Sequence, residues 1–162
     1  MTPFLMCAVT AALLAACDLP KEHSTKELID KLQGTWLAES YIQDGKRISD
    51  QADGLTTSVK IEIKGDKLAW VQVTSGKGKA IGVELQFDVK LDPTKKPVEM
   101  DLVFTGEKDQ ACTKSKLIRA ILKLDGDTLK IAVCWTDGRR PKKFKSDANS
   151  GNSVLLLKRK KE

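Results

Sequence analysis

Apolar and polar residues alternate with a period of two along most of the chain after Gln33. In residues 59–63, valine and isoleucine alternate with lysine and glutamate without exception, and residues 81–91 extend the pattern. Such alternation is typical of a β-strand with one buried face. We therefore predict about eight strands, over residues 35–42, 57–64, 67–74, 80–91, 97–104, 115–124, 128–135 and 153–159.

Short turn sequences separate these strands, including Asp44-Gly45, Gly65-Asp66 and Asp125-Gly126-Asp127. Glycine and aspartate accept the positive φ angles of tight hairpins. Helical patterns do not alternate with the strands, which argues against a parallel α/β sheet. We expect an all-β fold, an antiparallel up-and-down barrel of about eight strands, because closure removes exposed edges. An open β-sandwich is the alternative.

A short helix should precede the first strand. Ser24 and Glu27 have the spacing of a capping box, in which the serine oxygen accepts a hydrogen bond from the glutamate amide. Leu28, Ile29 and Leu32 then form one apolar stripe. Because so short a helix is unstable alone, we expect it to lie against the barrel.

The predicted inward faces are apolar, and an eight-stranded barrel is just wide enough to be filled or to hold one small ligand. Small residues after Trp36 in the first strand, Ala38 and Ser40, favour a cavity. In residues 81–91, the side chains predicted to point inward are Val83, Leu85, Phe87, Val89 and Leu91. Large inward residues favour a filled interior, such as Ile61, Phe87, Leu102, Phe104 and Ile131. Any ligand held inside the barrel should be a small hydrophobic molecule.

The N-terminus has the form of an export signal. Residues 4–16 are almost wholly apolar, and about 13 residues fall short of the roughly 20 of a membrane-spanning helix. The stretch ends in Leu14-Ala15-Ala16-Cys17, which resembles the lipobox of bacterial lipoproteins. The resemblance implies cleavage before Cys17, lipidation of its sulfur, and an exported protein held by its lipid at the periplasmic or cell-surface face of a membrane.

The length suits one domain. We divide the chain into a signal peptide at 1–16, a lipidated cysteine with its linker at 17–23, and a barrel domain at 24–162.

The chain is basic, because 28 Lys and Arg against 22 Asp and Glu give a formal net charge of +6 at pH 7. Basic residues cluster at 95–96, 139–143 and 158–161. These clusters either attract an anionic envelope surface or form solvated loops and a solubilising tail. Nucleic acid is not an expected partner of an exported protein.

Two of the four cysteines, Cys112 and Cys134, lie in the predicted domain beyond the lipidation site. An oxidising compartment permits a disulfide between them. Cys134 should lie opposite a residue near Ile118, so a bridge requires residues 106–113 to fold back. Two separate thiols are the alternative.

Catalytic chemistry has little support. The single histidine, His23, lies in the linker, so neither a histidine base nor a histidine-built metal site is expected in the domain. The strand carboxylates Glu84, Asp88, Glu99 and Asp101 fall on the outward faces. Solvated carboxylates lack the shifted pKa of acid–base catalysis. We expect no enzyme, no metal and no cofactor.

Gly34-Thr35-Trp36 stands between the helix and the first strand and resembles the G-x-W motif of lipocalins. In that family the tryptophan plugs one end of the barrel, and a basic residue of the last strand lies across its ring. The resemblance assigns these roles to Gly34, Trp36 and Arg159, with Lys158 as the alternative base.

A longer resemblance covers nearly all of residues 32–160. It extends to a small lipocalin-like domain family, abundant in planctomycete-type bacteria and without an established activity. The chain departs from the family at Arg119-Ala120-Ile121, where a Gly-Ile-Tyr is usual. The matching segments are Leu32-Gln33-Gly34-Thr35-Trp36, Asp44-Gly45-Lys46, Gly65-Asp66-Lys67, residues 91–97, residues 124–130, Arg140-Pro141 with Phe144, and Leu157-Lys158-Arg159.

The long basic loop at 137–152 carries Arg140 and Phe144. Loops at a barrel mouth often carry recognition. These residues either contact a ligand or partner or fasten the loop onto the barrel. Two functions remain open, a lipid-anchored binder of a small hydrophobic molecule and a non-catalytic envelope module with a filled core.

Overall fold

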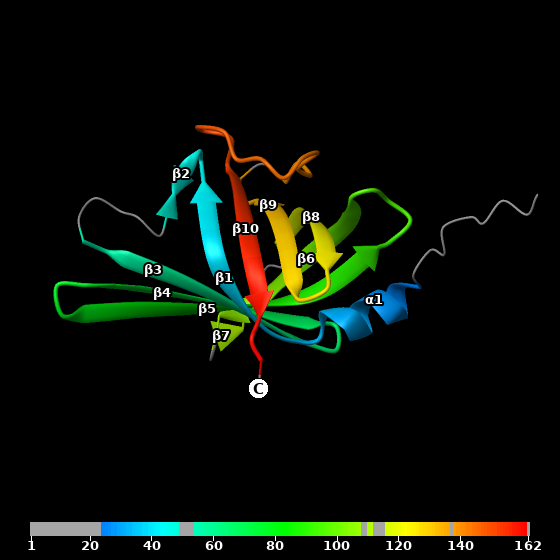
Figure 1. Ribbon diagram of the computed structural model, residues 1–162, viewed down its shortest axis with the longest axis horizontal. Helices are drawn as coiled ribbons and strands as arrows, with labels where there is room; N and C mark the ends of the chain where they lie inside the picture. Colours follow the sequence, from blue (N-terminus) through cyan, green and yellow to red (C-terminus); the bar gives the residue numbers. More distant parts are fainter. Residues whose placement is uncertain (1–23, 49–53, 108–109, 112–115, 137, 162) are drawn as a thin grey trace, which may run out of the picture.

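The computed structural model describes residues 24–48, 54–107, 110–111, 116–136 and 138–161. Within them the chain forms one closed antiparallel barrel with a short helix at one end (Figure 1). The eight barrel strands are β1 (Gly34–Gln43), β3 (Thr56–Lys64), β4 (Lys67–Gly76), β5 (Lys79–Asp92), β6 (Val98–Glu107), β8 (Leu117–Asp125), β9 (Thr128–Cys134) and β10 (Asn152–Arg159). Two short strands, β2 (Lys46–Arg47) and β7 (Gln110–Ala111), pair with β1 and β6.

The barrel closes between the first and last long strands. Neighbouring strands follow the order β10-β9-β8-β6-β5-β4-β3-β1, and β1 also pairs with β10, from Trp36 opposite Arg159 to Gln43 opposite Ser153. Every pairing is antiparallel. The prediction of an up-and-down barrel is confirmed, and the open sandwich is excluded.

The helix α1 (Thr25–Leu32) begins as predicted. Ser24 Oγ accepts a hydrogen bond from the Glu27 amide at 3.2 Å, and Leu28 and Leu32 are buried. The indole Nε1 of Trp36 donates to the Leu32 carbonyl at 2.9 Å. The helix is therefore held against the same tryptophan that opens β1.

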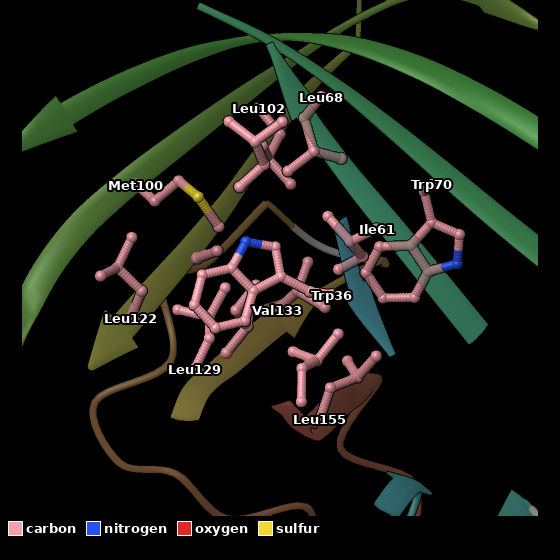
Figure 2. Close-up of a cluster of buried hydrophobic side chains, with 14 of the residues drawn as sticks. Trp36, Ile61, Leu68, Trp70, Met100, Leu102, Leu122, Leu129, Val133 and Leu155 are labelled. Carbon is pink, nitrogen blue, oxygen red and sulfur yellow. The ribbon is translucent and has the colours of Figure 1, made fainter. Parts of the chain in front are cut away.

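The barrel interior is filled with large apolar side chains (Figure 2). Trp36, Ile61 and Leu102 come from three different strands and have no exposed surface. Inward residues of β9 and β10 meet them from the other side, where Leu129, Leu155 and Leu157 are equally buried. Close packing of this kind leaves the side chains of the strands, rather than a ligand, as the contents of the barrel.

A β-bulge in β1 removes the space that Ser40 was expected to leave. The register shifts between Ala38 and Ser40, so Tyr41 rather than Ser40 pairs with the inward-facing Leu155. A bulge inserts one extra residue and reverses which face the following side chains occupy. The prediction that Ser40 faces inward is wrong, and the buried Tyr41 ring fills that position.

Three strands extend beyond the barrel as a flap, which we define as residues 56–59, 71–76 and 79–84. β1 pairs with β3 only at residues 60–63, and β6 pairs with β5 only from Leu85 onward, so β3, β4 and β5 continue alone (Figure 1). Val83 was predicted to be inside the barrel, and this is wrong. Val83 is 44% exposed and Ile81 is 71% exposed, because β5 extends beyond the strands that would cover these side chains.

Candidate functional site

The helix end of the barrel brings Gly34, Trp36 and Arg159 together. The guanidinium carbon of Arg159 lies 4.2 Å from the Trp36 ring centroid, within the range of a cation–π contact. Arg159 also donates to the Gln33 and Lys31 carbonyls and pairs with Asp127 at 3.3 Å. These contacts join the last strand to the helix and to the first strand.

Gly34 fits this arrangement because of its backbone. Its φ angle is +113°, and a Cβ at this position would lie 3.4 Å from the Arg159 guanidinium. Residues with a side chain rarely adopt such an angle. The contacts among Gly34, Trp36 and Arg159 thus close the barrel at its helix end. These contacts are all made within the chain.

The opposite end of the barrel carries an aromatic cluster of Tyr41, Trp70 and Trp135. Trp70 meets Trp135 edge-on with ring centroids 5.1 Å apart, and Tyr41 meets Trp70 at 6.3 Å. The Tyr41 hydroxyl donates to Gln43 Oε1 at 2.9 Å, and the Trp135 indole donates to Ser153 Oγ at 3.0 Å. Aromatic and polar groups therefore meet where the flap leaves the barrel.

Burial raises the pKa of Tyr41 above its ordinary value of 10.0, because the phenolate would lose contact with water. The Ser153 hydrogen bond opposes the shift, and the charge of Asp44 adds to it. A strict period of two predicted that Ser40 faces inward and did not predict the buried position of Tyr41. No feature of the sequence marks the bulge that turns Tyr41 inward.

The flap continues the inner face of the barrel into solvent. Register places Val83 beside Gln72 and Ile81 beside Thr74, and Thr57 and Thr74 share a hydrogen bond of 3.1 Å between their hydroxyls. Val59, which pairs with Gln72 on the same face, is buried. The two most exposed large apolar side chains of the described residues, Ile81 and Val83, thus lie on one face of β5 in the flap.

Arg140 is bound to the outside of the barrel. Its Nε pairs with Glu99 at 3.0 Å and its Nη2 with Asp101 at 2.6 Å. Its Nη1 donates to the Met100 and Ala120 carbonyls at 3.0 and 2.7 Å. This guanidinium is engaged within the chain, which favours the alternative that it fastens the loop over ligand contact.

Phe144 has a similar setting. Its ring packs against Ile121, Ala132 and Val154, which lie on the outward faces of β8, β9 and β10 yet are buried. The Lys130 ammonium lies 5.5 Å from the ring centroid. Apolar residues on outward strand positions were the sequence signal for a covering loop.

A basic surface groove of about 420 Å³ is bordered by Lys95, Lys96, Arg140 and Lys142 beside the long loop. Two further surface grooves lie outside the barrel within the described residues. One of about 420 Å³ is bordered by Glu62, Lys67 and Asp88, and the last two form an ion pair at 2.5 Å. The other, of about 730 Å³, lies between α1 and the β8–β9 turn and is bordered by Asp30 and Asp125. Both are open and edged by charged side chains that water can reach.

Within the described residues, no group of three or more histidine, cysteine, aspartate or glutamate side chains is placed to hold a metal ion. Cys134 is buried opposite Arg119, with its sulfur 3.8 Å from Thr136 Oγ1. Cys112 lies outside the described residues, so the disulfide remains a prediction. Cys17, the signal segment and the linker also lie outside them.

The part of the chain that the structure describes contains no helix long and apolar enough to cross a membrane. The sequence matches no protein-family model and no curated protein. The fold itself defines the class, an all-β lipocalin-like barrel with Trp36 at its helix end.

Proposed function

We propose that the protein is a lipid-anchored envelope lipoprotein whose barrel is a non-catalytic interaction module. The observation that carries this proposal is the filled interior, where Trp36, Ile61 and Leu102 leave no exposed surface. A barrel occupied by its own side chains acts through its outer surface. The two most exposed large apolar side chains of the described residues, Ile81 and Val83, lie on the flap and are available to a partner.

The anchor rests on the resemblance of Leu14-Ala15-Ala16-Cys17 to a lipobox. Lipid on Cys17 would hold the domain through the short linker at 17–23, on the periplasmic or cell-surface side of a membrane. Each buried methylene adds about 0.8 kcal/mol, so more than one acyl chain is needed for a stable anchor. The exposed lysines at 95–96 and 142–143 would then face the anionic surfaces of the envelope.

A non-catalytic role is supported by the state of the strand carboxylates. Glu99 and Asp101 are paired with Arg140, and Asp88 is paired with Lys67. All of these carboxylates remain partly exposed, and none lies in a dry cleft. Acid–base catalysis depends on a carboxyl group whose environment moves its pKa toward neutrality.

A small hydrophobic ligand is the second candidate, favoured by the apolar flap beside the aromatic cluster. Such a molecule would lie on Val83 and Ile81 near Trp135, at the mouth and not inside the barrel. Any affinity would be modest, because an open surface buries little of a ligand.

Native mass spectrometry of the protein extracted from its own host tests both parts of the proposal. We expect the mass of a chain beginning at Cys17 with covalent lipid, and no small molecule held without a covalent bond. A retained small molecule would replace the interaction module with the binder. An unlipidated full chain would refute the anchor.

A further inference from the structure

β5 has an open edge where it passes through the flap. β4 pairs with β5 from Lys79 opposite Gly76 to Asp88 opposite Lys67. β6 pairs with β5 only from Leu85 onward, so within the described residues no strand pairs with 79–83 on the β6 side. An unpaired strand edge is a template for another strand.

The backbone groups at this edge can be assigned. The Val89 amide donates to the Asp66 carbonyl at 2.7 Å, which shows that Val89 faces β4. The β4–β5 register is continuous, so alternate residues back to Ile81 also face β4. The N–H and C=O groups of Ala80 and Gly82 therefore point to the open edge.

The same stretch carries the most exposed apolar side chains of the flap. Ile81 is 71% exposed and Val83 is 44% exposed, and both lie on the inner face. The opposite edge of the flap is formed by β3, where the exposed side chains are the polar Thr56 and Ser58. The β5 edge is thus the apolar edge of the two.

We propose that the partner of the flap is a second copy of this chain, paired antiparallel along β5 with Ile81 opposite Ile81. The twofold axis then places Ala80 opposite Gly82 and Lys79 opposite Val83 of the second copy. The 80 and 82 pairs supply about four backbone hydrogen bonds, and the two Ile81 side chains meet in a non-hydrogen-bonded pair. This inference deepens the proposed function and rests on it.

The position of β6 selects this register. If the axis passed through Gly82, Lys79 of one copy would lie opposite Leu85 of the other, where Glu107 of β6 already pairs. With the axis at Ile81, the second strand ends before that point. The register also sets no like charges directly opposite each other, and the Lys77-Gly78 tip comes beside Glu84, which has the opposite charge.

The contact is small. Two short strand segments and four apolar side chains bury less than the roughly 1,200 Å² of a stable protein interface. Pairing in dilute solution is therefore weak. A lipid anchor would confine both copies to one surface and raise their effective concentration, so the membrane is where the pair forms.

Cysteine cross-linking of the full chain in its own membranes tests the register. In Ile81→Cys the two Cα atoms would lie about 4.5 Å apart, which permits a disulfide. In the matched control Val83→Cys they would lie about 13 Å apart along the strands, which does not. We expect about five-fold more cross-linked dimer from Ile81→Cys, after subtraction of the wild-type background from the native cysteines.

A second substitution tests the edge itself. Proline at Gly82 would remove the amide that faces the second copy, and an edge strand is where proline is tolerated in a sheet. A Cβ at this position would meet Val73 at an ordinary 3.7 Å. Gly82→Pro added to Ile81→Cys should abolish the cross-link while circular dichroism stays unchanged. Equal yields from the two cysteine variants, no dimer from Ile81→Cys, or a cross-link that survives the proline would overturn the pairing. These outcomes leave the mass-spectrometric test of the proposed function unaffected.

Discussion

The Arg159 guanidinium lies 4.2 Å from the centroid of the Trp36 ring and joins the last strand of the barrel to the first. The two residues are also paired in the β1–β10 register, so the contact sits at the seam where the barrel closes. A cation–π contact contributes about 0.5–2 kcal/mol, depending on its exposure. The larger contribution comes from the tryptophan, whose side chain is fully buried in the core.

Replacement of Trp36 with alanine should lower the free energy of unfolding by about 3–5 kcal/mol, because it leaves a large void in a packed core. Chemical denaturation measures this loss. The neighbouring variant Leu37→Ala is the control, since Leu37 is 42% exposed and should change stability little. Equal stability of the two variants would show that Trp36 does not plug the barrel.

The Arg140 substitution tests how the long loop is held. Arg140→Ala removes the partners of Glu99 and Asp101 and should lower stability by about 1–3 kcal/mol. Limited proteolysis should then cut faster within residues 138–151. Lys143→Ala removes an exposed charge of the same loop and should not alter cleavage. Unchanged cleavage of Arg140→Ala would mean that other contacts hold the loop.

Tyr41 is the single tyrosine of the chain, so tyrosinate absorbance reports on it alone. Its raised pKa in the folded state means that the unfolded chain loses this proton first as pH rises. The contribution of Tyr41 to stability is present below pH 10.0 and is lost as pH rises above it. Tyr41→Phe should therefore lose less stability above pH 10.0 than the wild type. A tyrosinate titration of the folded protein with its midpoint at or below pH 10.0 would contradict the burial.

Cys17→Ala tests the anchor. The variant should leave the membrane fraction and appear in the soluble fraction with an unchanged melting temperature, because the anchor lies outside the barrel core. Cys134→Ala is the matched control and should stay with the membrane. If Cys17→Ala still sediments with membranes, the lipobox interpretation is wrong.

Alternation along the chain was sufficient to predict the eight long strands and most of their inward faces, because a half-buried strand needs a period of two. It did not predict the β1 bulge, since Ser40 and Tyr41 are both acceptable in a strand and the choice depends on pairing with Leu155. It also misplaced Val83. Val83 lies outside the barrel because β5 extends beyond the point where β6 begins to pair with it. The position of that point is a property of the whole sheet.

The filled interior is the claim on which the proposed function depends, and Ala120→Leu tests it most directly. Ala120 points inward opposite Met100 and has no exposed surface. In a packed interior the larger side chain should lower the free energy of unfolding by about 1–3 kcal/mol. An unchanged or higher free energy of unfolding would mean that the barrel holds room for a guest, and would contradict the account.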